Sequence, residues 1–328
     1  MLDLDDPLWR KLDDASYREF DIPKLLSLLA ETWDGDQANS LFWDCLLHQE
    51  TCYGATYAAI PHLLTIAEPG VNRHQRLEIA IFLGTIARCA FRGQYQICKG
   101  EQGPLEGLPE TLDEWNGRRD RYRDRIVTLE DPNHPSSRFE QTVVLPYYKN
   151  SLKIDPLTED DLQKIRLIRR DFFEALPNIR ALCERAFLEN IGEGELGLYL
   201  LAGIAATVGL YDLANTLAHG VEGTFKCSSC DWTYEYHLFK DRIAIYAEEE
   251  INRYCKAHLD DYEDGAPLRA DGFMLPIAVD ERIADRRVAA LLELASRATV
   301  PIPMLLLRNF LGRFDCRKCG AERPVVVV

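Results

Sequence analysis

The 328-residue chain has no apolar run long enough to cross a membrane, and its acidic start, MLDLDDPLWRKLDD, lacks the apolar core of a signal peptide. Positive charge is scarce as well: 38 lysines and arginines face 53 aspartates and glutamates, for a formal net charge of −15. A general nucleic-acid binder needs clustered lysine and arginine, so this balance disfavours that class. We expect a cytoplasmic protein without a membrane partner, whose acidity favours solubility or the docking of a basic protein.

The sequence also lacks the common enzyme signatures GxxxxGK[ST], GxGxxG, GxSxG and HExxH. The nearest string, HQETC at His48, has no second histidine. Acidic pairs such as Asp260-Asp261 are numerous, but no spacing marks a catalytic pair of carboxylates. These observations favour a protein that is not an enzyme.

Three stretches of the chain share one pattern, in which an apolar residue and a proline precede an apolar helix, a polar break and a second apolar helix. The pairs are Ile22-Pro23, Ile60-Pro61 and Leu176-Pro177. The first two pairs lie 38 residues apart, and the next gap of 116 residues is about three such periods. A period of ~40 residues with paired helices is typical of HEAT-type or armadillo-type repeats. The pattern predicts a mainly α fold, a HEAT-like α-solenoid of stacked helical hairpins.

Residues 1–220 form this predicted repeat region, interrupted at about 93–158 by sequence rich in proline, glycine, asparagine and serine. One helical piece, DEWNGRRDRYRDRIVTL, lies inside the interruption. So long an irregular segment is either functional or a decorative insertion, and both interpretations stay open. From residue 221 the character changes, because TFKCSSCDWTYEYHLF alternates apolar and polar residues as a strand does.

Ten cysteines divide into two classes. Six are scattered and are expected to be small buried hydrophobes: Cys45, Cys52, Cys89, Cys98, Cys183 and Cys255. The other four form two CxxC pairs, each with a phenylalanine two residues before its first cysteine. Such pairs supply two thiolates from one tight turn, and two pairs supply the four ligands of a tetrahedral Zn²⁺. The predicted ligands are Cys227, Cys230, Cys316 and Cys319.

The spacing between these pairs is long, since 86 residues separate Cys230 from Cys316. We expect a C-terminal zinc-ribbon module in 221–328, built from 221–240 and 312–328, with the intervening helices looped out. Four thiolates leave no position for water, so the expected zinc is structural rather than catalytic. The alternative, a redox CxxC, usually lies near a βαβ pattern, and the sequence has no such pattern.

A second unusual stretch, LLHQETCYGATYAAIPHLL, places polar and aromatic side chains at a helix end and at the start of the next helix. These residues could line a concave binding groove, with two tyrosines of the insertion beside it. The candidates are His48, Gln49, Tyr53, Tyr57, His62, Tyr147 and Tyr148. The alternative is core packing, in which buried tyrosine and histidine find hydrogen-bond partners.

The stretch HQxxxYxATYAAxPHL, followed by two late CxxC motifs, resembles a group of bacterial HEAT-repeat-like proteins. The matching positions are His48, Gln49, Tyr53, Ala55, Tyr57, Ala58, Ala59, Pro61, His62 and Leu63, together with the four paired cysteines. The resemblance implies a HEAT-like fold and a zinc site, and it brings no activity with it. Proteins of this type are similar to repeat proteins encoded beside bacterial toxins as immunity partners.

Three functions follow as hypotheses. The first is a non-enzymatic, protein-binding α-solenoid with a structural zinc, an immunity protein that neutralises a basic toxin. The second is a nucleic-acid-associated protein with a footprint at Arg118 to Arg125, although Asp120 and Asp124 there indicate ion pairs within the helix. The third is an enzyme with a site in the groove near His48 and Tyr57.

Overall fold

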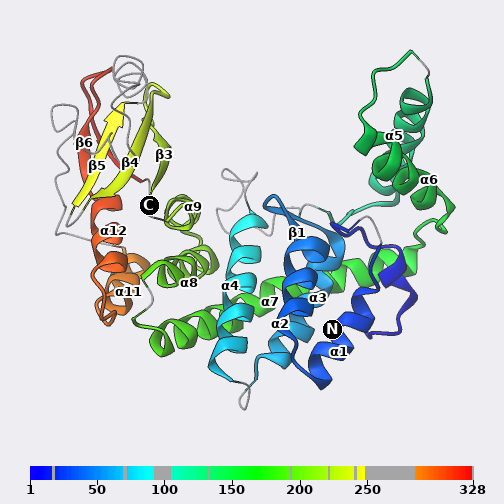
Figure 1. Ribbon diagram of the computed structural model, residues 1–328, viewed down its shortest axis with the longest axis horizontal. Coiled ribbons are helices and arrows are strands. Elements are labelled where there is room, and N and C mark those ends of the chain that lie inside the picture. Colours follow the sequence, from blue (N-terminus) through cyan, green and yellow to red (C-terminus); the bar gives the residue numbers. More distant parts are fainter. Residues whose placement is uncertain are drawn as a thin grey trace. The chain divides into compact units, whose positions relative to one another are not determined.

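The computed structural model describes residues 1–16, 19–68, 72–91, 105, 107–131, 133–192, 194–220, 222–239, 242–247 and 285–326 (Figure 1). The chain is mainly helical with a few short strands, as predicted. It divides into two compact units, unit 1 (Met1–Asn178) and unit 2 (Ile179–Val328). The predicted division at residues 220 and 221 separates a repeat region from a cysteine module, and it stays a prediction. Among the helices of the described ranges, none combines the length and the apolar character that a bilayer crossing requires.

In its described residues, unit 1 consists of helices and one small hairpin. These elements are the 3-10 helix η1 (Pro7–Arg10), α1 (Ile22–Glu31), α2 (Gly35–Asn39), the π-helix η2 (Ser40–Leu46), β1 (Leu47–His48), β2 (Thr51–Cys52), α3 (Gly54–Ile66), α4 (Arg73–Cys89), α5 (Leu112–Glu130), the π-helix η3 (Glu140–Val144), α6 (Leu145–Lys153) and the first part of α7 (Glu159–Glu189). Local chemistry sets several of these boundaries. The side chains of Asp21, Asn72 and Thr111 accept backbone N–H bonds at the starts of α1, α4 and α5.

The apolar-proline pairs do not mark equivalent positions. Pro23 lies in the first turn of α1, but Pro61 lies inside α3 and Pro177 lies inside α7. The expectation that Leu176-Pro177 opens a helix is therefore wrong, because α7 begins at Glu159 and continues through the proline. A proline removes one backbone hydrogen bond of a helix, and α7, with 31 residues, tolerates that loss. The repeat solenoid itself stays a prediction.

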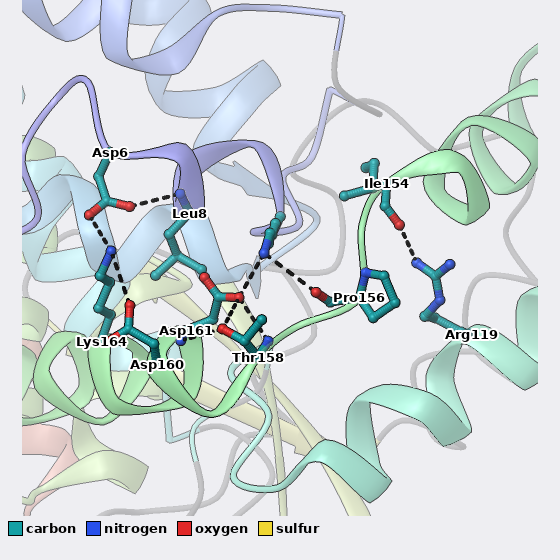
Figure 2. Close-up of polar contacts among 10 residues, drawn as sticks. Asp6, Leu8, Arg119, Ile154, Pro156, Thr158, Asp160, Asp161 and Lys164 are labelled. Carbon is teal, nitrogen blue, oxygen red and sulfur yellow. Dashed lines mark hydrogen bonds and ion pairs between the residues drawn. The ribbon is translucent and has the colours of Figure 1, made fainter.

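From residue 107 onward, where most of it is described, the insertion at 93–158 is more regular than its composition indicates. Its expected helical piece is confirmed as α5, but η3 and α6 occupy a part that was expected to be irregular. Pro146 lies in the first turn of α6, which follows η3 without a break. At the other end, the buried Arg119 guanidinium donates to the carbonyl oxygens of Ser151 (3.3 Å), Leu152 (2.8 Å) and Ile154 (2.9 Å; Figure 2). A cation at the C-terminus of a helix satisfies its free carbonyls and stabilises its dipole.

Charged hydrogen bonds fasten the amino-terminal segment to the start of α7 (Figure 2). Lys11 Nζ donates to Asp161 Oδ2 at 2.7 Å, and the same oxygen accepts the backbone N–H and the hydroxyl of Thr158, both at 2.8 Å. Lys164 Nζ donates to Asp6 Oδ2 at 2.9 Å. Burial alone would raise the pKa of Asp161, but the bonds from Lys11 and Thr158 hold that pKa below its ordinary value.

Aromatic rings fill the core of unit 1. Phe42 of η2 stacks on Phe82 of α4, with ring centroids 4.3 Å apart and planes 6° from parallel. Tyr57 of α3 meets Phe172 of α7 edge to face at 5.2 Å. Such pairs add stabilisation beyond the area they bury, so they fix η2 on α4 and α3 on α7.

The described residues of unit 2 combine helices with two small antiparallel sheets. The elements described after α7 are α8 (Gly194–Thr207), α9 (Tyr211–Ala218), β3 (Glu222–Lys226), β4 (Thr233–Phe239), β5 (Arg242–Ala247), α11 (Arg286–Ala295), α12 (Ile302–Phe310), β6 (Arg313–Asp315) and β7 (Glu322–Pro324). The sheets have the orders β3-β4-β5 and β6-β7. The predicted strand after the first cysteine pair is confirmed as β4, and the side chains of Tyr234 and Tyr236 on its inner face are fully buried.

Contacts on two sides hold β4 against the helices of unit 2. The Tyr236 hydroxyl donates to the carbonyl oxygen of Thr216 in α9 at 3.0 Å, and its ring meets Phe310 of α12 edge to face at 5.0 Å. Gly223 of β3 passes so close that an added Cβ would lie 2.8 Å from the Tyr236 hydroxyl oxygen and 2.9 Å from His219 Cβ. Only glycine fits there. These contacts attach the β3-β4-β5 sheet to the helices of unit 2 without involving the cysteines.

Candidate metal centre

The structure brings the two CxxC pairs together, as the sequence predicts. The four Sγ atoms of Cys227, Cys230, Cys316 and Cys319 all lie within 4.8 Å of one another. Cys227 Sγ lies 3.9 Å from Cys319 Sγ, and Cys230 Sγ lies 3.7 Å from Cys316 Sγ. Four thiolates around a zinc ion, each at ~2.3 Å, place their sulfur atoms about 3.8 Å apart. All four cysteines are free, and the cluster could hold a metal ion.

The first pair lies on a tight turn between β3 and β4. The Cys227 N–H donates to the carbonyl oxygen of Trp232 at 2.9 Å, and the Asp231 N–H donates back to the Cys227 carbonyl oxygen at 3.0 Å. Asp231 takes a φ of 53°, in the left-handed region. Aspartate tolerates that region better than most residues do. The turn directs the thiols of Cys227 and Cys230 to the same side.

The second pair repeats this turn between β6 and β7. The Cys316 N–H donates to the carbonyl oxygen of Ala321 at 3.0 Å, and the Gly320 N–H donates to the Cys316 carbonyl oxygen at 2.7 Å. Gly320 has a φ of 68°, so it occupies the position that Asp231 occupies in the first turn. The two turns share their hydrogen bonds and their left-handed residue, although one sequence has glycine there and the other does not.

Tyr234 connects the two turns directly. Its hydroxyl donates to Cys316 Sγ at 3.2 Å and accepts the Arg317 N–H at 3.0 Å, while its ring meets Phe314 edge to face at 5.1 Å. Sequence reasoning placed Tyr234 on one face of an alternating strand and missed this role. The alternation of apolar residues indicates which face of a strand is buried. It cannot indicate a hydrogen bond to Cys316, which lies 82 positions away.

The surroundings favour negative charge on one of the thiols. Burial raises the pKa of Cys316, but hydrogen bonds from the Tyr234 hydroxyl and from the backbone N–H groups of Cys319 and Lys318 lower it to about 6. The Trp232 backbone lowers the pKa of Cys230, but burial and the three neighbouring cysteines raise it to about 12. A metal cation would replace the shared protons of such a set.

The stretch around His48 is divided between the surface and the core. His48 and Gln49 are exposed at the β1-β2 hairpin. In its two-residue turn Gln49 and Glu50 both have positive φ, at 48° and 62°, where glycine or asparagine is usual. The nearly buried Arg88 guanidinium donates to Glu50 Oε1 at 2.8 Å and holds the turn in place.

The aromatic and histidine candidates that follow the hairpin contribute to packing. Tyr57 is fully buried, and the backbone N–H of Tyr53 donates to the Thr56 hydroxyl at 2.8 Å at the start of α3. His62 Nε2 lies 2.8 Å from the Leu2 carbonyl oxygen, and burial lowers the pKa of this histidine. His48 and Gln49 therefore do not share an open face with Tyr57.

The tyrosines of the insertion lie within a polar cluster of unit 1. The Tyr147 hydroxyl donates to Asp13 Oδ1 at 3.3 Å, and the Arg118 guanidinium pairs with the other oxygen of Asp13. Tyr148 stacks on Tyr122 at 4.8 Å. These contacts fasten α5 and α6 to the amino-terminal segment. Asp13 was not among the residues singled out from the sequence.

The arginine-rich part of α5 is occupied with internal contacts. The expected ion pair within the helix is present between Arg123 and Asp120. Arg118 instead reaches Asp13, Arg119 caps α6, and Arg125 Nη2 lies 2.6 Å from Glu140 Oε1. Most of the positive charge at this candidate nucleic-acid footprint is thus neutralised within unit 1.

Comparison of the chain with protein-family models, with curated proteins and with solved structures finds no match. The resemblance to bacterial HEAT-repeat-like proteins therefore stays a prediction made from the motifs. What the chain does has to be argued from its own residues.

Proposed function

We propose that this chain is a non-enzymatic, protein-binding helical protein in which Zn²⁺ staples the two hairpins of unit 2. The observation that carries this proposal is the closed set of four sulfur atoms on two matching turns. With four protein ligands no coordination position is left for water or substrate, so the metal is structural. Zinc bound in this way contributes folding free energy, on the order of 10 kcal/mol in small zinc modules.

The charge of the chain supports a basic protein as the partner. A net charge of −15 attracts a positively charged partner and speeds its association. The internal contacts of Arg118, Arg119 and Arg125 leave little of the α5 footprint for phosphates, which favours a protein over a nucleic acid. In its most specific form, the proposal is that this chain is an immunity protein that neutralises a basic bacterial toxin. The motif resemblance supports this form.

Co-expression with each neighbouring gene tests the proposed function. We expect one neighbour to be toxic alone and harmless when this chain is present, and the two purified proteins to form a complex that weakens as salt is added. Harmless neighbours, or toxicity that persists beside folded protein, would contradict the immunity function. A gel shift with mixed DNA and RNA at low salt serves as the control, and we expect no binding.

A further inference from the structure

Unit 1 contains a small pocket between the end of α2, the π-helix η2 and α4. Its volume is about 160 Å³, and its lining residues are Ala38, Asn39, Phe42, Trp43, Glu78 and Ile81. Five of these six side chains are uncharged, and the only charge is the carboxylate of Glu78. The pocket is thus an apolar and aromatic hollow with one negative group.

Packing fixes the aromatic wall of this pocket. Trp43 meets Phe82 edge to face at 5.5 Å, and Phe42 stacks on the same fully buried Phe82 at 4.3 Å. Trp43 nevertheless stays 37% exposed, a large fraction for an indole held by its neighbours. It projects from a π-helix of seven residues, a rare geometry that recurs at functional sites. Because the Trp43 ring is held by its neighbours yet accessible to solvent, a ligand that stacks on it loses little binding free energy to side-chain ordering.

The carboxylate of Glu78 has spare acceptor capacity. Its Oε2 is buried and accepts no hydrogen bond within the described part of the chain. His74 Nδ1 lies 3.5 Å from this oxygen, on a side chain that is 76% exposed. The Glu78 side chain as a whole is 34% exposed, so a cationic ligand in the pocket can meet its carboxylate.

We infer that this pocket binds one arginine side chain of a basic protein partner. A guanidinium ion can stack on the Trp43 indole and donate hydrogen bonds to the Glu78 carboxylate, while its methylene stem covers Ile81. Arginine suits the pocket better than lysine, because a guanidinium is planar and more weakly hydrated than an ammonium. The inference names the contact by which the proposed function recognises its partner, and it rests on that proposal.

Titration with a blocked tripeptide, acetyl-Gly-Arg-Gly-amide, tests the pocket itself. The chain has five tryptophans, so five indole N–H signals appear in a nitrogen-proton spectrum, and a Trp43→Phe variant identifies the signal of Trp43. We expect the arginine peptide to shift that signal with a dissociation constant in the millimolar range, ~1–10 mM. The signals of Trp115 and Trp232, which lie in α5 and beside the cysteines, should not move.

Two matched controls separate charge from shape. The same peptide with citrulline, which has the shape of arginine without its charge, should bind about fivefold more weakly or not at all. Glu78→Gln should weaken the arginine peptide by a similar factor and leave the citrulline peptide unchanged. An unmoved Trp43 signal in folded protein, equal binding of both peptides, or full affinity in E78Q would each overturn the inference.

The pocket and the proposed function fail in distinguishable ways. If the arginine peptide binds but no neighbouring gene product does, the partner proposal is wrong and the pocket stands. If a basic partner binds and its affinity is unchanged in E78Q and Trp43→Leu, the partner proposal stands and the pocket is not its contact. If both are right, each of these variants weakens the partner by about fivefold or more.

Discussion

Within unit 1, charged hydrogen bonds join groups far apart in sequence, such as Lys11 and Asp161, which are 150 positions apart. Within unit 2, four cysteines join two hairpins whose pairs are separated by 86 positions. Only the second set of contacts is visible in the sequence. Cysteines are rare and two residues between them fix a turn, whereas any of 53 acidic residues can pair with any of 38 basic ones. Long-range contacts are predictable where the residue type is rare and its local geometry is fixed.

The largest predicted effect comes from removing one metal ligand. Cys316→Ser should release the metal and destabilise unit 2 by several kcal/mol, since binding of this kind contributes on the order of 10 kcal/mol. Amide hydrogen exchange measures the result, with faster exchange expected in β4, β6 and α12 and unchanged rates in α1 and α3. Faster exchange throughout unit 1 as well would contradict the view that the cysteine cluster stabilises unit 2 alone.

Cys183→Ala is the matched control for this change. Cys183 is a fully buried cysteine of unit 2 outside the cluster, and burial raises the pKa of its thiol to about 12, so it stays protonated. The variant should keep its metal and lose only about 1–2 kcal/mol of stability through the small cavity. Loss of metal from this variant would mean that the cluster responds to any disturbance of the unit.

The next effect separates the two halves of the His48 stretch. Tyr57→Ala removes a fully buried ring from against Phe172 and should cost about 3–5 kcal/mol. His48→Ala, at the exposed hairpin, should change stability by less than about 0.5 kcal/mol. Urea unfolding of both variants measures the difference. Similar losses in the two variants would contradict the division between surface and core.

A smaller, pH-dependent effect belongs to Asp161. Because its folded pKa lies below the ordinary 3.8, it stabilises unit 1 above that pH, and the contribution is lost as pH falls through the folded pKa. Asp161→Asn should cost about 1–3 kcal/mol at pH 7 and much less at pH 2. The neighbouring Asp160→Asn, at an 80% exposed side chain, is the control and should show little effect. An equal loss of stability for Asp161→Asn at pH 7 and at pH 2 would contradict the claim that the ionised carboxylate stabilises unit 1.

The smallest effect compares the two cysteine turns. Gly320→Ala places a Cβ in open space at a φ of 68°, so its cost of about 1–2 kcal/mol is purely conformational. Asp231→Gly should do the reverse and raise stability by a few tenths of a kcal/mol or more, since Asp231 holds the same conformation at 53°. Thermal unfolding in excess zinc measures both. A gain in stability for Gly320→Ala, or a loss for Asp231→Gly, would show that the two turns are not equivalent.

Much of the fold follows from local patterns in the sequence. The cysteine pairs, the alternation that makes β4, and the helical piece that forms α5 are all confirmed. Features that depend on distant partners were missed. The composition of the insertion gives no sign of α6, whose C-terminal carbonyls accept hydrogen bonds from the distant Arg119. Pro177 suggests a helix start, although α7 continues through it. The roles of Tyr234 and Asp13 are likewise set by residues far along the chain.

The central claim is that one structural zinc ion is held by Cys227, Cys230, Cys316 and Cys319. Its most direct test is the metal content of the full chain, purified without added metal or chelator, by elemental analysis. The account predicts one zinc per chain, and none after Cys316→Ser. A chain that is folded in unit 2 yet carries no metal, or that carries iron in place of zinc, would contradict it.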